Sequence, residues 1–192
     1  MNDPLLESKQ VLRVQVRARV AGLSSQYRAA AAAQVVMSLA ARPEWARASS
    51  VLLFAPLLDE LDVWLLAELA LTAGKRVALP AFVPSTSSYA ARQIVDPVRD
   101  VIVGKFGVRE PATTCVDVPL NQLDLVLVPG VAFDARGGRI GRGKGFYDRL
   151  LAGVRGTKCG VAFDEQLVDA VPVGPNDIRL NCILTPTRWI ET

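Results

Sequence analysis

Short runs of apolar residues alternate with helical segments along most of this 192-residue chain. The run SSVLLFAPL is followed by the amphipathic segment LDVWLLAELALTAG and then by a second apolar run, KRVALPAF. Later runs repeat the pattern: LDLVLVPGVAFD, TKCGVAFD and NCILTPT. Strands that are apolar throughout are typical of sheets buried on both faces. The alternation predicts an α/β fold with an open, mostly parallel twisted sheet and helices on both faces, in a three-layer, Rossmann-like arrangement.

The length of the chain fits one domain, and we predict a single domain over residues 1–192. The N-terminal MNDPLLESKQ lacks the apolar run of a secretory signal, and no apolar stretch is long enough to span a membrane. The three cysteines are far apart and form no CxxC pair, which favours free thiols in a reducing compartment. These features predict a cytoplasmic protein with no membrane partner.

The chain contains no histidine. Ser-His-Asp and Cys-His catalysis and histidine metal sites are therefore excluded. Carboxylates, cations, hydroxyls and backbone N–H groups remain for catalysis, and a hard cation such as Mg2+ could be held by oxygen ligands. The net charge of +3 is small for a nucleic-acid-binding protein, so we expect the positive side chains to act locally and no nucleic-acid partner.

A basic helix is predicted at the N-terminal end, over residues 4–20. Lys9, Arg13 and Arg17 recur at every fourth position, which places them on one face of that helix. By itself, such a face is most often solvated.

A glycine-rich segment, GGRIGRGKG at 137–145, follows the strand LDLVLVP and precedes a helix predicted from about Lys144 to Ala152. Ligands of open α/β sheets bind beyond the carboxyl ends of the strands, where this segment is expected to lie. Glycines allow a close approach of the backbone, and successive N–H groups can form an anion-binding concavity. Arg139, Arg142 and Lys144 add mobile or bidentate cations. The segment therefore predicts a phosphate-rich ligand, with a flexible surface loop as the alternative.

Neither standard phosphate-binding fingerprint describes this segment. Gly138 to Lys144 satisfies GxxxxGK, but Gly145 follows where a P-loop requires Ser or Thr. The spacing GxGxG also differs from the dinucleotide pattern GxGxxG. Asp148, one turn into the predicted helix, is either a Mg2+ ligand or an exposed residue that pairs with Arg149 or Arg155.

The segment LVLVPGVAFDARGGRIGRGKGFYDRLL resembles the signature of the 5-formyltetrahydrofolate cyclo-ligase family. Four further segments are similar to elements of that family, in the same order: KQVLRVQVRARVAGLS, LLDELDVWLL with GKRVALPAF, GKFGVREP, and GVAFDEQLVDAVPVGPNDIRLNCILT. The similarity extends from about Lys9 to Thr185, whereas residues 83–100 match poorly.

The resemblance implies an ATP- and Mg2+-dependent cyclisation of 5-formyltetrahydrofolate to 5,10-methenyltetrahydrofolate. The formyl oxygen would take the γ-phosphate of ATP, N10 would attack the activated formyl carbon, and phosphate would leave. Phosphoryl transfer depends on positioning and charge neutralisation, so it does not require histidine. The expected partners are ATP and a reduced folate, with or without a polyglutamate tail, and the protein is expected to be a monomer.

The resemblance also implies roles for individual residues. Lys144 and Arg142 would be catalytic, because they would neutralise the transferred phosphoryl group, and Asp148 and Asp177 would hold Mg2+. Glu60 would accept paired N–H donors from the pterin ring, although alone it would be taken for a solvated loop acid. The ATP-binding set comprises Lys9, Arg13, Gly138, Arg139, Ile140, Gly141, Arg142, Gly143, Lys144, Gly145, Phe146 and Tyr147. The substrate-binding set comprises Ala55, Glu60, Arg142, Gly143, Lys144, Gly145 and Phe146.

Two departures from the family pattern leave an alternative open. Val63 stands where the family often has threonine, and Phe146 stands where tyrosine is common, which removes a hydroxyl near the folate. A non-catalytic ATP- or folate-binding member is the alternative, against which the retained cationic and acidic candidates argue. An RNA-associated protein is a third hypothesis, disfavoured by the small charge and the lack of interleaved aromatic residues.

Overall fold

The computed structural model describes residues 4–104 and 107–192. Residues 1–3 of the N-terminal segment, and Lys105 and Phe106 of GKFGVREP, lie outside the described residues. No helix in the described part of the chain is long and apolar enough to cross a membrane.

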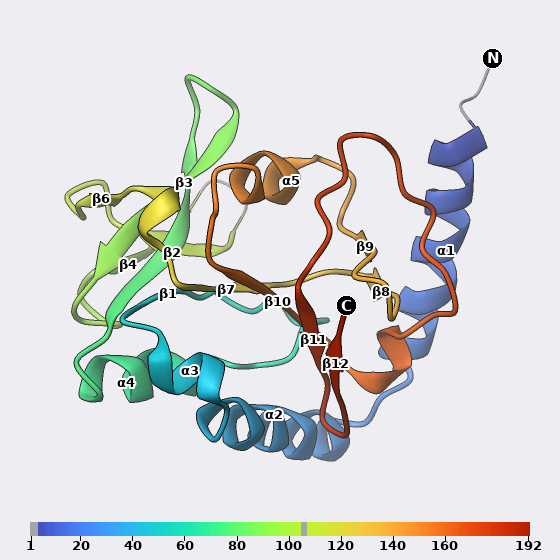
Figure 1. Ribbon diagram of the computed structural model, residues 1–192, viewed down its shortest axis with the longest axis horizontal. Helices are drawn as coiled ribbons and strands as arrows, with labels where there is room; N and C mark the ends of the chain where they lie inside the picture. The colour runs from blue at the N-terminus through green and yellow to red at the C-terminus, as the bar shows by residue number, and fades with distance from the viewer. Residues whose placement is uncertain (1–3, 105–106) are drawn as a thin grey trace.

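An eight-stranded sheet forms the centre of the protein, in the order β12-β11-β10-β7-β1-β2-β3-β6 (Figure 1). Strands β11, β10, β7, β1 and β2 are parallel, whereas β12, β3 and β6 join in antiparallel fashion at the two sides. The predicted open, mostly parallel sheet is confirmed. Its strands are β1 (Ser50–Leu52), β2 (Arg76–Val83), β3 (Ser88–Ile94), β6 (Asp117–Val118), β7 (Leu125–Val128), β10 (Thr157–Val161), β11 (Cys182–Leu184) and β12 (Trp189–Glu191).

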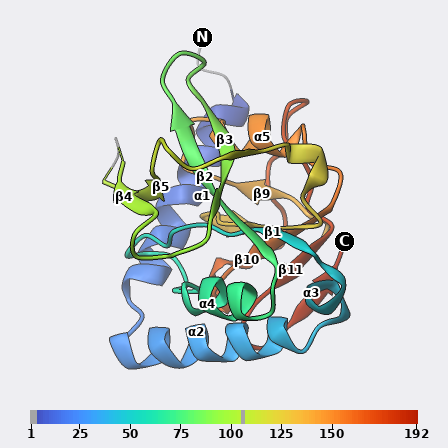
Figure 2. The ribbon, with the colours of Figure 1, turned by 90° about the vertical axis from the view of Figure 1, so that its left-hand side faces the viewer.

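Helices cover both faces of the sheet, as predicted, because successive residues of each buried strand point to opposite sides. Val51 packs in one core with the first four helices, and its neighbour Leu52 packs in a second core with the fifth. Figure 2 shows α2 and α4 beneath the sheet and α5 above it. The helices are α1 (Pro4–Ala21), α2 (Ser25–Ala40), α3 (Pro43–Arg47), α4 (Leu65–Thr72) and α5 (Phe146–Leu151), with short 3-10 turns η1 (Leu120–Gln122) and η2 (Asp164–Gln166).

Two small hairpins lie beside the main sheet. Strand β4 (Val101–Val103) pairs with β5 (Arg109–Pro111) in antiparallel fashion. Strand β8 (Ala132–Phe133) pairs with β9 (Arg139–Ile140), directly before the glycine-rich loop. Both hairpins contribute residues to the cavity described below.

The helix predicted to begin at Lys144 begins two residues later. Gly143 and Gly145 have φ angles of 95° and 63°, in the left-handed region that a right-handed helix cannot contain. The prediction of the helix start was therefore wrong, because Lys144 lies between two glycines in a loop conformation. As a result, Lys144 belongs to the loop and not to the first turn of α5.

Candidate functional site

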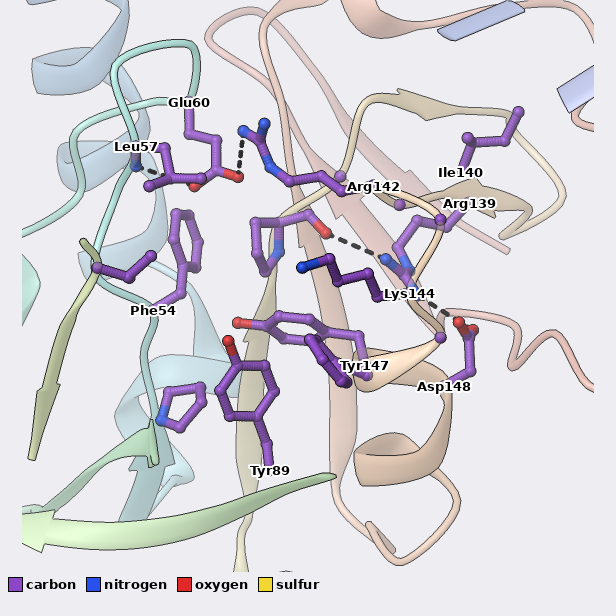
Figure 3. A pocket seen from close by; sticks show the side chains of 18 of the residues that line it. Phe54, Leu57, Glu60, Tyr89, Arg139, Ile140, Arg142, Lys144, Tyr147 and Asp148 are labelled. Atoms are coloured by element: carbon purple, nitrogen blue, oxygen red, sulfur yellow. Dashed lines mark hydrogen bonds and ion pairs between the residues drawn. The ribbon is translucent and has the colours of Figure 1, made fainter. Parts of the chain in front are cut away.

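A cavity of about 450 Å3 opens at the carboxyl ends of β1 and β7 (Figure 3). Phe54 and Ala55 follow β1, and Pro129 and Gly130 follow β7, so the two parallel strands deliver their ends to the same wall. Helix α1, the loop after β1, strand β5 and the glycine-rich loop supply the other walls. This is the position at which open α/β sheets bind ligands.

The glycine-rich loop lines the cavity from Gly141 to Gly145. Helix α1 packs against the loop, since Arg13 Nε donates a hydrogen bond to the carbonyl oxygen of Gly141 at 2.9 Å. Burial and the nearby Arg17 lower the pKa of Arg13, and Asp177 opposes that shift. The basic face of α1 is therefore not simply solvated, because part of it belongs to this site.

An ion pair joins the N-terminal helix to a loop 168 residues later: Lys9 Nζ lies 2.5 Å from Asp177 Oδ2. The two side chains are only 11% and 21% exposed, respectively. The same carboxylate oxygen accepts the Gly174 N–H at 2.6 Å. Burial alone would raise the pKa of Asp177, but the Gly174 N–H and Lys9 outweigh it and leave the pKa lowered. Two residues predicted to act on ATP and Mg2+ are thus brought together.

Arg139, which the sequence analysis groups with Arg142 and Lys144 as mobile or bidentate cations, is held inside the protein. It is 6% exposed, and it donates to Asp148 Oδ1 at 3.1 Å and to the carbonyl oxygen of Pro129 at 3.3 Å. Asp148 Oδ1 also lies 3.5 Å from the Ile178 N–H, next to Asp177. Arg139 therefore anchors Asp148 close to the segment that carries the second predicted metal ligand.

Arg142 connects the glycine-rich loop to the loop after β1. Its Nη2 atom lies 2.5 Å from Asp59 Oδ1 and 3.0 Å from Glu60 Oε1. Glu60 is not a solvated loop acid, because its side chain is 9% exposed and its other oxygen accepts the Leu57 N–H at 3.1 Å. Burial raises the pKa of Glu60, and the Leu57 N–H and Arg142 reduce this shift without cancelling it.

Aromatic rings form the wall opposite Glu60. The ring of Tyr89 lies 5.2 Å from that of Phe146 and 6.3 Å from that of Tyr147. The hydroxyl groups of Tyr89 and Tyr147 point into the cavity (Figure 3). Lys144 Nζ lies 5.9 Å from the centre of the Phe146 ring, so a loop cation borders this wall. The arrangement offers a flat ring ligand apolar surfaces beside hydrogen-bonding groups.

Most of the predicted site residues line the cavity, but Gly138 does not. Its N–H donates to Asp134 Oδ1 at 2.9 Å, so this amide serves the turn between β8 and β9. Phe54, Tyr89 and Glu110 line the cavity and were missed. Tyr89 lies in the poorly matching segment, and Glu110 lies between Arg109 and Pro111 in GKFGVREP, where the local sequence gives no signal of its burial.

The two predicted metal ligands both line the cavity. Asp148 engages the protein through Oδ1 and Asp177 through Oδ2, which leaves one oxygen of each carboxylate without a hydrogen bond within the described chain. No group of three or more His, Cys, Asp or Glu side chains gathers among the described residues. Two carboxylates fit Mg2+, which is commonly held by one or two carboxylates together with substrate phosphates and water.

A family model described as the 5-formyltetrahydrofolate cyclo-ligase family matches residues 6–186. The chain belongs to the 5-formyltetrahydrofolate cyclo-ligase family. It is 33% identical over 180 residues to the 5-formyltetrahydrofolate cyclo-ligase of Escherichia coli strain K12, covering 92% of this chain and 99% of that relative. It is 30% identical over 182 residues to the cyclo-ligase of Haemophilus influenzae, covering 93% and 97% of the two chains.

A solved structure is also similar to this cyclo-ligase family member. The 5,10-methenyltetrahydrofolate synthetase of Aquifex aeolicus matches with a TM-score of 0.86 and 32% identity, over 95% of this chain and 92% of the other. The predicted fold class, family and ATP-dependent cyclo-ligase activity are thereby confirmed. They favour the enzyme over a non-catalytic or RNA-associated member.

Proposed function

We propose that the cavity binds ATP and 5-formyltetrahydrofolate side by side and closes the folate ring with the residues described above. The observation that carries this proposal is that the cationic glycine-rich loop, two acids suited to Mg2+ and the buried Glu60 all line one cavity. Phosphates require cations and N–H donors, whereas a pterin ring requires an acceptor for its N–H groups. One cavity that offers both brings the two substrates together.

The phosphates would lie along the loop from Gly141 to Gly145 and against α1. Glycines expose backbone amides there, and Lys9, Arg13 and Lys144 add positive charge. We assign Lys144 and Arg142 to the γ-phosphoryl group that is transferred. Its bond to the β-phosphate oxygen breaks while a bond to the formyl oxygen forms, and ADP is left. These cations would lower the barrier by neutralising charge in a preorganised site.

In the second step, N10 of the folate attacks the formyl carbon and loses its proton, and the carbon–oxygen bond to the phosphate breaks. The products are 5,10-methenyltetrahydrofolate and inorganic phosphate. The chain contributes by holding N10 close to that carbon and by keeping the site shielded from water. The rings of Tyr89, Phe146 and Tyr147 would hold the folate in this position.

Asp148 and Asp177 would hold Mg2+ through their unengaged oxygens. When bound, Mg2+ neutralises the phosphate oxygens during transfer. Arg139 and Lys9 already fix the two carboxylates, so the ligands are oriented before the metal and nucleotide arrive.

Glu60 would recognise the pterin ring. A carboxylate accepts two parallel N–H bonds, and Arg142 holds Glu60 Oε1 while the Leu57 N–H holds Oε2. The raised pKa of Glu60 fits a buried acceptor whose remaining lone pairs face a ligand in place of water. Arg142 thereby links folate recognition to the loop that holds the phosphates.

The decisive experiment incubates the purified protein with 5-formyltetrahydrofolate and MgATP and follows the absorbance of the methenyl product. We expect product only when ATP and Mg2+ are both present, with one ADP released per folate closed. Binding of both substrates without any product would instead support the non-catalytic alternative. A monomeric state and a cytoplasmic location stay predictions, the first of which light scattering would test.

A further inference from the structure

The further inference concerns a carboxylate that no part of the proposed reaction has used. Glu110, in strand β5, lines the cavity and is only 7% exposed. Its Oε2 atom accepts the backbone N–H of Phe82 at 2.9 Å. Its Oε1 atom is buried and has no hydrogen-bond partner. Among the described residues three buried side-chain polar atoms lack a partner, and this is the one carboxylate oxygen of the three.

A buried, unpaired carboxylate oxygen is costly to a protein. Burial removes the water that would hydrogen-bond to it, and a charged acceptor loses more by this than a neutral one. No ion pair of the described residues includes Glu110. The adjacent Arg109 instead places its guanidinium 4.0 Å from the centre of the Trp64 ring. The structure therefore maintains an acceptor that its own chain does not satisfy.

The surroundings of Glu110 indicate what kind of donor could satisfy it. A carboxylate repels phosphate, so the nucleotide phosphates are an unsuitable partner. Glu110 and Glu60 line the same cavity as the rings of Tyr89 and Phe146. A flat ring bound in that cavity therefore has two carboxylates as possible acceptors. A reduced pterin carries N–H donors on more than one edge. Its ring is also uncharged, which suits the apolar walls of the cavity.

We propose that Glu110 is a second recognition residue for the reduced pterin, whose Oε1 accepts a ring N–H while Glu60 binds a different edge. The inference rests on the proposed function, because it assumes that the folate ring occupies this cavity. Glu110 is a positioning residue: it would orient the ring, and it takes no part in phosphoryl transfer. Glu60 would hold the ring at one edge only, and a second acceptor at a different edge would restrain the other side of the ring as well. This would place the formyl group toward the glycine-rich loop.

The Glu110 carboxylate lies against Gly104, in the space that a larger side chain there would fill, so Gly104 provides an independent variant. A Cβ added at Gly104 would lie 2.6 Å from Glu110 Oε1, and Gly104 itself does not line the cavity. Gly104→Ala therefore displaces the carboxylate while keeping its charge. Glu110→Gln keeps the size of the side chain. Its NH2 group, which is a donor, would face either the ring N–H or the Phe82 N–H and could accept a hydrogen bond from neither.

The test measures the Kd of 5-formyltetrahydrofolate by calorimetry without ATP for the wild-type chain and these two variants. Losing one charged hydrogen bond should raise Kd by about tenfold to a hundredfold in Glu110→Gln. Gly104→Ala should show a loss in the same direction, and the Kd of MgATP should change less than about twofold in both. The fragment p-aminobenzoylglutamate, which lacks the pterin, should bind equally to all three chains. Glu68→Gln, on the exposed side of α4, serves as the matched control.

Unchanged 5-formyltetrahydrofolate affinity in folded Glu110→Gln would overturn the proposal, as would an equal loss of fragment and whole-folate binding. A purely structural Glu110 would lower the unfolding temperature without changing this selectivity. If both variants fail to fold, a wild-type crystal with 5-formyltetrahydrofolate decides, because a Glu110 Oε1 beyond hydrogen-bond distance of every ring nitrogen is incompatible with it. Failure of the overall function is recognised separately, by absence of product from wild-type chain with MgATP.

Discussion

The turn between β8 and β9 and strand β5 each bury a carboxylate, but they differ in how many hydrogen bonds they donate to it. Asp134, in the turn between β8 and β9, is 2% exposed and accepts the N–H groups of Arg136, Gly138 and Val171 at 2.9, 2.9 and 2.7 Å. Glu110 is 7% exposed and accepts a single backbone N–H. The turn donates three hydrogen bonds to Asp134 and so stabilises the fold. Strand β5 instead leaves Glu110 Oε1 without a partner, so this oxygen can accept a hydrogen bond from a ligand.

The charged pairs of the cavity lie between these two extremes. Lys9 with Asp177, and Arg142 with Asp59 and Glu60, are paired in the structure, yet part of each side chain stays in contact with solvent. The Arg142–Asp59 pair is the most exposed of them, at 38% and 41%, and such a pair contributes little to stability, so Arg142 can exchange Asp59 for a phosphate at little cost in free energy. This difference separates residues whose loss should unfold the chain from residues whose loss should only stop its chemistry.

Lys144→Ala should affect chemistry far more than stability. Removing a preorganised cation from a phosphoryl-transfer site should lower kcat by about a hundredfold or more. The unfolding temperature should stay within a few degrees of wild type, as for the exposed control Arg155→Ala. Steady-state kinetics with a thermal melt measure both quantities. Wild-type kcat in Lys144→Ala would remove Lys144 from the proposed mechanism.

Asp134→Asn should show the reverse pattern. Burial raises the pKa of Asp134, but three backbone N–H donors outweigh it and leave the pKa lowered. A lowered folded-state pKa means that this stabilisation is present above the ordinary aspartate pKa and is lost as the pH falls below it. The variant should lose about 2–4 kcal/mol of unfolding free energy at neutral pH and less in acid.

Denaturant unfolding at several pH values measures the effect of Asp134→Asn, with the exposed Asp169→Asn as its control. The kcat per folded molecule should stay near wild type. A large loss of kcat without a loss of stability would show that the turn takes part in recognition, contrary to the contrast drawn above.

Glu60→Gln should raise the Kd of 5-formyltetrahydrofolate by about tenfold to a hundredfold, with little change for MgATP. Because burial raises the pKa of Glu60, wild-type folate affinity should fall as the pH is lowered through that raised pKa, where the acceptor becomes protonated. Glu60→Gln should lack this pH dependence. Calorimetry across a pH series tests both points, and a larger effect on MgATP would mean that Glu60 serves the nucleotide.

Asp148→Asn should have a smaller effect than these three. Asp177 and the nucleotide phosphates would still hold Mg2+, so the half-saturating Mg2+ concentration should rise only about threefold to tenfold. Turnover measured against Mg2+ at fixed ATP gives this value. An unchanged Mg2+ response would leave Asp148 as the partner of Arg139 alone.

Much of the site could be predicted because its residues cluster in the chain. The loop from Gly141 to Gly145 combines glycines with cations directly after a buried strand, and a fold of alternating strands and helices brings such a loop to a ligand site. Arg139 has the same side chain as Arg142 in the same segment, yet one is buried and the other reaches the loop after β1. Local sequence does not distinguish them, because long-range packing determines which face of the β8–β9 hairpin is enclosed.

The order of apolar strands and helices by itself determined the α/β class, the mostly parallel sheet and the place of the glycine-rich loop, because burial and chain connectivity act through patterns that are local in sequence. Tertiary structure alone decided that Lys9 meets Asp177, that the Glu60 side chain is only 9% exposed and that Glu110 keeps an unsatisfied oxygen. Hydrogen-bond satisfaction and burial depend on groups far apart in the chain, so they are defined only after the chain has folded.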